Sequence, residues 1–210
     1  MTSLRPINKY RVVVMGAAAV GKSCIINRFL YQQFVDGYRA TVEDFYLDKF
    51  QVNGVQVELE IVDTAGAYSF PAMRKLAISS GDAFILVYGV DDEETFQEVK
   101  RLRDEILSGK DNDKAPPIVV VANKVDCLLG ERAIPKEEAE STANIDWDAG
   151  YVEVSAKDDI NVCSVFHELL IQAKLSPRNK LAIRRQNTVP VSSNVKKHPK
   201  LSKTNSCVIA

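Results

Sequence analysis

The feature that most constrains how this chain folds is an eight-residue stretch near its start, Gly16-Ala17-Ala18-Ala19-Val20-Gly21-Lys22-Ser23. It fits the phosphate-binding loop pattern of Gly, any four residues, Gly-Lys-Ser. Residues 10–15 before it form a β-branched run typical of a buried parallel strand, and residues 24–30 after it carry apolar side chains at helical spacing. These flanks favour a phosphate-binding loop over a glycine-bearing turn with an incidental lysine.

A loop of this kind holds phosphate groups through its backbone and its side chains together. The two glycines allow the tight turn that brings successive N–H groups round a phosphate, and the start of the following helix adds partial positive charge. Lys22 would pair with the outer phosphates. Ser23 would offer its hydroxyl to Mg²⁺, a hard cation that takes oxygen ligands.

Strand-like and helix-like segments alternate along the rest of the chain, with a loop at residues 34–41. We predict further strands at residues 42–52, 55–62, 83–90, 118–122 and 151–154, with a hairpin turn at Asn53-Gly54, and further helices at residues 91–106, 135–142 and 160–174. The alternation predicts an α/β fold. We expect a doubly wound, mostly parallel six-stranded sheet with helices on both faces, and ligands at the carboxyl ends of its strands.

Asp63 directly follows the second strand of the predicted hairpin and precedes Thr64-Ala65-Gly66. A carboxylate at the end of an apolar strand is placed to hold Mg²⁺ through water, as the second acidic element of phosphate-loop enzymes does. A lone Asp in this position is more simply a turn residue. The metal assignment therefore depends on the phosphate-binding loop upstream.

Two short segments that each follow a predicted strand can together read guanine: Asn123-Lys124-Val125-Asp126 and Ser155-Ala156-Lys157. The Asp126 carboxylate can accept hydrogen bonds from the ring N–H and the exocyclic amine of guanine, an edge that adenine lacks. Asn123 can meet the other edge of the base, and the stem of Lys124 can lie on its face. Either segment alone is a weak signal, but in this order they indicate guanine recognition.

With these motifs in register, the chain resembles the Ras-like small GTPases over residues 9–174 and looks closest to the Rhes and Dexras group of that subfamily. The resemblance implies the P-loop GTPase fold, GTP or GDP and Mg²⁺ as ligands, GTP hydrolysis, and a switch in signal transduction. It implies metal contacts from Ser23, Thr41 and, through water, Asp63, and catalytic positions at Lys22, Thr41, Gly66 and Ala67. The nucleotide contacts that it implies are Gly16, Ala17, Ala18, Ala19, Val20, Gly21, Lys22, Ser23, Cys24, Phe34, Thr41, Asp63, Gly66, Asn123, Lys124, Asp126, Ser155, Ala156 and Lys157.

The same resemblance assigns the segments that partners would bind. Phe34 matches the aromatic that packs on guanine, and Thr41 matches the threonine that completes Mg²⁺ and senses the γ-phosphate. Residues 34–41 and 64–73 match the two switch loops, and Thr41–Asp44 resembles the effector stretch. We therefore expect effectors, an exchange factor and an activating protein as partners of a monomeric protein, and no nucleic acid.

Two positions depart from the family pattern, and both bear on hydrolysis. The family usually has glycine where Ala18 stands, because a side chain there crowds an arginine finger from an activating protein. It usually has glutamine where Ala67 stands, and that amide orients the attacking water. These departures predict slow hydrolysis and leave open a binding module that holds GTP constitutively, which single-turnover hydrolysis would distinguish. A phosphate-loop kinase or ATPase is opposed by Asp126, and competition with ATP would test it.

The charge distribution divides the chain into a short extension at residues 1–8, a GTPase domain at residues 9–174 and a flexible basic tail at residues 175–210. From Leu169 to the end there are nine Lys and Arg and no Asp or Glu, whereas the whole chain has a net charge of −1. A basic arm on an acidic domain is typical of binding to an anionic surface.

The chain ends in Cys207-Val208-Ile209-Ala210, which has the form of a prenylation box, and a terminal Ala favours farnesyl over geranylgeranyl. One lipid chain gives only marginal membrane binding, so a second signal is needed. Lys196, Lys197, Lys200 and Lys203 can supply it on the inner leaflet. We expect the protein at the cytoplasmic face of the plasma membrane, with a cytosolic pool. A competing use of the basic stretch 178–185 is a calmodulin-type partner.

Overall fold

The computed structural model describes residues 8–37, 40–52, 55–66, 71–110, 115–127, 131–174, 182–185 and 206–208. Its centre is a sheet of six strands in the spatial order β6-β5-β4-β1-β3-β2. These strands are β1 (Asn8–Met15), β2 (Glu43–Val52), β3 (Val55–Thr64), β4 (Ala83–Gly89), β5 (Ile118–Asn123) and β6 (Gly150–Glu153). Neighbours run parallel except for β2, which is antiparallel to β3. The predicted doubly wound, mostly parallel six-stranded sheet is therefore confirmed.

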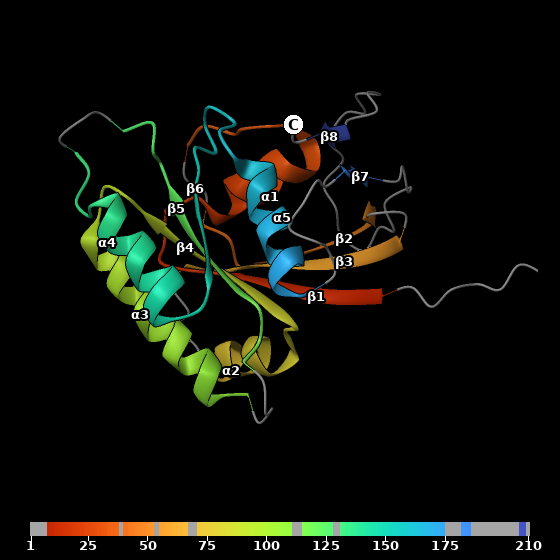
Figure 1. Cartoon of the computed structure of the whole chain (residues 1–210), viewed down its shortest axis with the longest axis horizontal. Helices are drawn as coiled ribbons and strands as arrows, with labels where there is room; N and C mark the ends of the chain where they lie inside the picture. The colour runs from red at the N-terminus through yellow and green to blue at the C-terminus, as the bar shows by residue number, and fades with distance from the viewer. Residues whose placement is uncertain are drawn as a thin grey trace, which may run out of the picture.

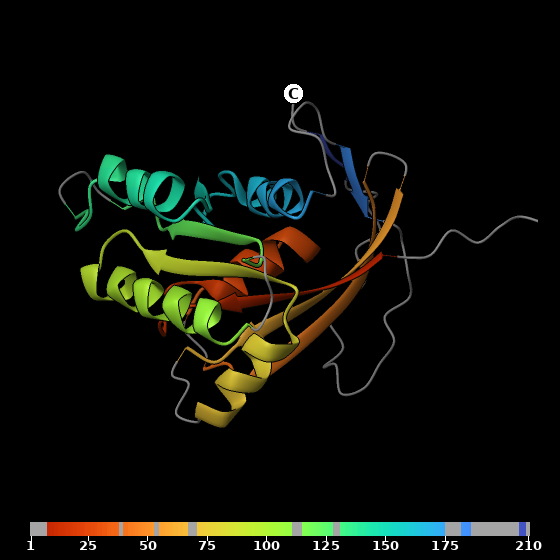
Figure 2. The same cartoon turned by 60° about the horizontal axis from the view of Figure 1, so that its bottom comes forward.

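Helices cover both faces of this sheet, as the two views in Figure 1 and Figure 2 show. On one face, α1 (Lys22–Tyr31) and α5 (Val162–Gln172) contribute to the same apolar core. The core of the other face receives side chains from α2 (Pro71–Ser80), α3 (Glu93–Ser108), α4 (Lys136–Ser141) and the π-helical turn η1 (Thr142–Asp146) that continues α4. The sheet is thus enclosed on both sides, as a largely parallel sheet requires.

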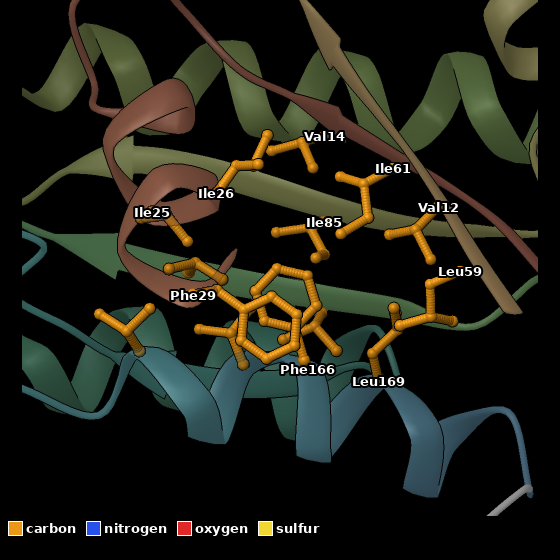
Figure 3. Close-up of a cluster of buried hydrophobic side chains, with 14 of the residues drawn as sticks. Val12, Val14, Ile25, Ile26, Phe29, Leu59, Ile61, Ile85, Phe166 and Leu169 are labelled. Atoms are coloured by element: carbon orange, nitrogen blue, oxygen red, sulfur yellow. The ribbon is translucent and has the colours of Figure 1, made fainter. Parts of the chain in front are cut away.

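The core under α1 and α5 fixes the helix that follows the phosphate-binding loop. Phe29 of α1 stacks on Phe166 of α5 with ring centroids 3.6 Å apart and planes 11° from parallel. Ile25 and Ile26, both fully buried, point from α1 into the same cluster, which Figure 3 shows against β1 and β3. An aromatic pair of this kind adds about 0.5–1.5 kcal/mol beyond the area that it buries. Helix α1 is therefore anchored along its length, and its first turn has a fixed place.

The parallel strands bring their carboxyl ends to one edge of the sheet. The register pairs Val14 of β1 with Asp63 of β3, and Gly89 of β4 with Asn123 of β5. Strands β4 and β5 consist almost entirely of apolar residues, and all seven residues of β4 and all six of β5 are buried. Polar residues begin only where the strands end. The segments predicted to bind ligand are therefore neighbours in space.

Some elements were not predicted from the sequence. Helix α2 was missed because only Ala77 and Ile78 of its ten residues are buried, which leaves a weak apolar period. The helix predicted at residues 135–142 is shorter, and its path ends in the π-helical turn η1. The hairpin turn at Asn53-Gly54 lies outside the described residues, although β2 and β3 on either side pair antiparallel.

Two short strands lie within the stretch predicted as a basic tail. Residues Ala182–Arg185 form strand β7 and Ser206–Val208 form strand β8, as Figure 1 shows. Strand β7 pairs antiparallel with Phe50–Val52 of β2, and β8 pairs antiparallel with β7. The physical reason is that β2 is the edge of the six-stranded sheet, where backbone N–H and C=O groups are available to another strand.

Among the described residues, no helix combines the length and the apolar composition needed to cross a membrane.

Candidate functional site

The loop between β1 and α1 adopts the tight path that its glycines predict. Gly16 has φ 144° and Gly21 has φ 95°, a region that favours glycine. A Cβ on Gly16 would lie 2.1 Å from the Val87 carbonyl oxygen, and one on Gly21 would lie 2.2 Å from Nδ2 of Asn123. Ala19 also has a positive φ, of 59°. Backbone held in sparsely populated conformations is typical of ligand-binding loops, so the geometry supports a phosphate-binding loop here.

Lys22 lies beneath this loop and is almost completely buried, with 6% of its surface exposed. Its ammonium donates to the carbonyl oxygens of Gly16 at 3.0 Å and Ala17 at 2.7 Å. Burial lowers the pKa of Lys22 to about 8, and the nearby Asp63 carboxylate partly opposes that shift. A buried cation held against the inner side of a loop is placed to meet anionic oxygens that the loop encloses.

Three oxygen-bearing side chains predicted to meet Mg²⁺ converge beside Lys22. Ser23 Oγ donates to Asp63 Oδ2 at 2.5 Å and lies 2.9 Å from Thr41 Oγ1. Asp63 is fully buried, and its Oδ1 atom has no hydrogen-bond partner among the described residues. Burial raises the pKa of Asp63 to about 6, while the Ser23 hydrogen bond and the Lys22 charge oppose that shift.

This oxygen set fits a magnesium ion. A buried carboxylate oxygen without a partner is costly, and a cation beside it would satisfy it. Two hydroxyl groups and one carboxylate suit the hard ligand preference of Mg²⁺, which keeps several waters and needs few protein ligands. Within the described residues, no cluster of three or more His, Cys, Asp or Glu residues offers a rival metal site.

The segment after β3 packs directly against the phosphate-binding loop. A Cβ added to Gly66 would lie 2.3 Å from Cα of Ala18 and 2.8 Å from the carbonyl oxygen of Ala17. Thr64, just before it, is fully buried and donates through Oγ1 to the carbonyl oxygen of Val14 at 2.7 Å. Gly66 therefore sits where its backbone can share a ligand with the loop, and only glycine fits there. Ala67 lies outside the described residues.

Asn123, at the end of β5, joins two of the predicted ligand-binding loops. Its Nδ2 donates to the carbonyl oxygen of Val20 at 2.8 Å, and its Oδ1 accepts from the backbone N–H of Ala156 at 3.1 Å. The side chain is only 3% exposed. Asn123 is thus held as a structural link between the two loops, and the sequence alone had suggested a direct contact with the base.

Asp126 and Ser155 are brought together as the sequence predicted. Ser155 Oγ donates to Asp126 Oδ1 at 2.7 Å, and Nζ of Lys157 lies 3.8 Å from Asp126 Oδ2. Asp126 is half-buried and Ser155 is fully buried. One Asp126 oxygen is therefore oriented by a buried hydroxyl, which fixes the plane of the carboxylate for recognition of a paired N–H edge.

Three further residues of the predicted site occupy its margins. Cys24 is a half-buried free thiol in the first turn of α1, and burial raises its pKa. Phe34 is half-buried and lies beside Arg28. Lys124 has φ 71° at the turn after β5. All three lie next to residues of the loops after β1, β5 and β6 that the sequence assigns to the nucleotide.

Sequence reasoning missed two residues that shape this pocket. Asp91 forms an ion pair with Lys124, whose Nζ lies 3.0 and 3.2 Å from its carboxylate oxygens. Arg28 of α1 binds the backbone of the loop after β6. The sequence pattern places Asp91 at the start of a helix. Its position just after a buried strand is a second signal, which indicates a place at the ligand-binding edge of the sheet. Arg28 carried no signal, since an arginine on a helix is usually a solvated residue.

The edge of the sheet therefore carries three adjoining sub-sites. One is a loop of backbone N–H groups with a buried lysine, the second is a set of oxygen ligands for a divalent cation, and the third is the Asp126 carboxylate that Ser155 holds in place. Phosphate, Mg²⁺ and a heterocyclic base with a paired N–H edge are the groups that fit them in that order. The arrangement suits a nucleotide whose phosphates and base bind at opposite ends.

Comparison with known proteins gives a family match and several close relatives. Residues 11–175 match the model of the Ras family. The chain is 43% identical over 189 residues to the GTP-binding protein Rhes of Homo sapiens, covering 87% of this chain and 71% of that protein. It is 44% identical over 175 residues to the proteins of the same name in Mus musculus and Rattus norvegicus, covering 80% of this chain and 66% of theirs. The chain thus spans roughly two thirds of the length of these curated relatives.

Proposed function

This chain belongs to the Ras family of small GTPases and is similar to Rhes, and we propose that it acts as a membrane-anchored GTP/GDP switch with slow intrinsic hydrolysis. GTPases of this family bind GTP and GDP, generally with Mg²⁺, and work with effectors, exchange factors and activating proteins. The finer assignments for this chain rest on its own residues.

The observation that carries the proposal is the meeting of Lys22, the Ser23, Thr41 and Asp63 oxygens, and the Asp126 pocket at one edge of the sheet. These groups match the phosphates, the metal ion and the base of one nucleotide. Competition binding tests it directly: with Mg²⁺ present, GTP and GDP should displace a fluorescent GDP analogue, and ATP at the same concentration should not. Displacement by ATP would favour a phosphate-loop ATPase or kinase instead.

The residues divide the work on a bound nucleotide among them. When bound, Mg²⁺ supplies charge neutralisation between the outer phosphates. Lys22, held against the loop, would meet phosphate oxygens, and Asp63 and Ser23, which are hydrogen-bonded to each other, would hold the cation. Thr41 reaches the same oxygen cluster from the loop before β2. Thr41 lies in the segment that we assign to partner binding. Its contact with Ser23 would therefore make the conformation of that segment depend on which phosphates are bound.

A surface next to this contact suits protein partners. Exposed apolar side chains stand on β2, on the residue just before it and on α2: Val42, Phe45, Leu47, Met73 and Leu76. An open groove between the two elements is lined by Phe45, Met73 and Leu76 and also reaches Glu43 and Arg11. Large exposed apolar side chains gathered around a groove are typical of protein interaction sites. We assign this surface, continuous with the Thr41–Asp44 stretch, to effector binding.

Gly66 provides a test of the switch itself. In Gly66→Ala the added Cβ would collide with Ala18, because the two backbones are too close for any side chain. We expect the variant to bind GDP within a few-fold of the original protein but to lose the GTP-dependent protection of residues 64–73 from limited proteolysis. Equal protection by GTP in Gly66→Ala and in the unchanged protein would show that the approach of Gly66 to the loop is not part of switching.

The alternative is a module that holds GTP constitutively and scarcely hydrolyses it. Ala18 and Ala67 favour it, because neither the space for an arginine finger nor the water-orienting amide is supplied at those positions. The nucleotide found on protein purified from cells separates the two functions. A switch would carry GDP in a fraction that changes with stimulation, whereas a constitutive module would carry GTP throughout.

Membrane attachment is proposed through Cys207, with Lys196, Lys197, Lys200 and Lys203 as the second signal. Each lysine near an anionic leaflet contributes about 1 kcal/mol, so four of them strengthen a single lipid chain appreciably. We expect Cys207→Ser to move the protein from the membrane fraction to the soluble fraction, and replacement of the four lysines by glutamine to reduce membrane binding less completely. Ser206→Ala is the matched control. Unchanged fractionation of Cys207→Ser would show that no lipid on this residue holds the protein at the membrane.

A further inference from the structure

Arg28, in the last turn of α1, is hydrogen-bonded to a part of the chain far away in sequence. Its Nε donates to the carbonyl oxygen of Ala156 at 3.0 Å, and its Nη2 donates to the carbonyl oxygen of Lys157 at 2.6 Å. A third bond runs from Nη1 to the carbonyl oxygen of Gln32 at 3.3 Å. The guanidinium thus spans the end of α1 and the loop after β6.

The two carbonyl groups that Arg28 holds belong to the loop that completes the base pocket. On its other side, the same loop donates from the Ala156 N–H to Asn123 and from the Ser155 hydroxyl to Asp126. The loop is therefore fixed from both sides, by the base-reading residues in front and by Arg28 behind. Loss of the rear contact would leave Ser155, and with it the orientation of the Asp126 carboxylate, less defined.

The same guanidinium also faces Phe34. Its Cζ lies 5.8 Å from the centroid of the Phe34 ring, within the range of a cation–π contact. Phe34 is half-buried at the start of the loop that leads to Thr41. One side chain of α1 therefore contacts both the loop after β6 and Phe34, the aromatic residue that the sequence assigns to the base.

We propose that Arg28 is a positioning residue for the guanine base, which holds the Ser155–Lys157 loop and Phe34 in place and so sets how long a nucleotide stays bound. This inference rests on the proposed function. Arginine is suited to the task because its planar fork presents several donors in fixed directions, whereas lysine offers one point charge. The hydrogen bonds of Arg28 go to Ala156, Lys157 and Gln32, and none goes to the oxygen ligands Ser23, Thr41 and Asp63, so it acts on base recognition and not on hydrolysis.

The test measures dissociation of a fluorescent GDP analogue from the full chain with Mg²⁺ for Arg28→Ala, Arg28→Lys and the control Arg101→Ala. Arg101 is an exposed arginine of α3 that forms an ion pair with Glu98 on the same helix. We expect dissociation to be about tenfold faster in Arg28→Ala, the equivalent of one lost hydrogen bond to a charged group. Arg28→Lys should recover part of the loss, and Arg101→Ala should match the unchanged protein.

A second readout separates positioning from a general loss of stability. Inosine diphosphate (IDP) lacks the exocyclic amine that would donate a hydrogen bond to Asp126. The ratio of GDP to IDP affinity therefore reports how well that carboxylate is placed. We expect Arg28→Ala to lower this ratio severalfold with an unchanged single-turnover rate of bound GTP. If Arg28→Ala does not fold, the same ratio in Arg28→Lys decides.

Two results would overturn the inference: dissociation in the Arg28 variants within twofold of the unchanged protein, or faster dissociation of GDP and IDP alike with the ratio preserved. Failure of the unchanged protein to bind GDP would instead refute the proposed function.

Discussion

Replacing Asp126 with Asn is expected to turn a guanine-binding protein into one that prefers xanthine. The carboxylate accepts from two N–H groups of guanine, and each bond to a charged acceptor contributes about 1.5–3 kcal/mol. Asn has nearly the same size and shape as Asp, but its amide NH2 group would face the exocyclic amine of guanine, donor against donor. Xanthine has an oxygen at that position, which can accept from the amide. We expect GDP affinity to fall roughly a hundredfold or more, which corresponds to about 3 kcal/mol, and affinity for xanthosine diphosphate to rise.

The matched control for this change is Asp158→Asn. Asp158 is exposed in the loop after β6, and its backbone N–H donates to Ser155 Oγ at 2.9 Å, so the substitution removes the same charge without touching the base-reading carboxylate. It should leave GDP affinity within a few-fold of its original value. Isothermal titration with GDP and xanthosine diphosphate would measure both variants. Undiminished GDP affinity in Asp126→Asn would refute the assignment of Asp126 to the base.

The second large effect is expected on hydrolysis. The protein as it stands should hydrolyse GTP slowly and gain little from a Ras-type activating protein, because Ala67 has no amide to orient water and Ala18 crowds an incoming arginine finger. The double variant Ala18→Gly with Ala67→Gln should recover that response. Since an arginine finger accelerates such reactions by roughly a thousandfold or more, stimulation of the double variant in single-turnover assays should be of that order.

Ala19→Gly serves as the control, because it adds a glycine to the same exposed part of the loop, at a residue with φ 59°, without making room at Ala18. It should leave hydrolysis slow. Ala67→Gln alone should raise the intrinsic rate and respond weakly to the activating protein. Rapid hydrolysis by the unchanged protein, or its recovery from cells mostly with GDP, would contradict the account given for both alanines.

The prediction from sequence succeeded where one residue type has one physical use. Gly16 and Gly21 predict backbone with positive φ, which locates the phosphate-binding loop. The apolar runs of β4 and β5 predict a buried parallel sheet, which gives the fold. Asp126 and Ser155 could be paired because both follow strands whose ends meet at one edge. In these cases the local pattern and the tertiary arrangement demand the same residues.

Prediction failed where the tertiary contact alone gives the residue its meaning. Arg28 acts through carbonyl oxygens more than a hundred residues away, and backbone groups carry no sequence signature. Helix α2 shows too few buried residues for its period to be read. Strands β7 and β8 depend on an open sheet edge supplied by β2, which a reading of residues 182–208 in isolation could not include.

The position of β7 along β2 bears on how the molecule would stand on a bilayer. Strand β7 pairs with Phe50–Val52, at the end of β2 away from Glu43, whose neighbour across the sheet is Thr64 at the nucleotide edge. A lipid attached to the chain beyond β7 would therefore hold the domain at the end of the sheet opposite the nucleotide site. Anchored in that way, the domain would turn Thr41–Asp44 and the base pocket toward the aqueous side, within reach of proteins that diffuse in from the cytosol.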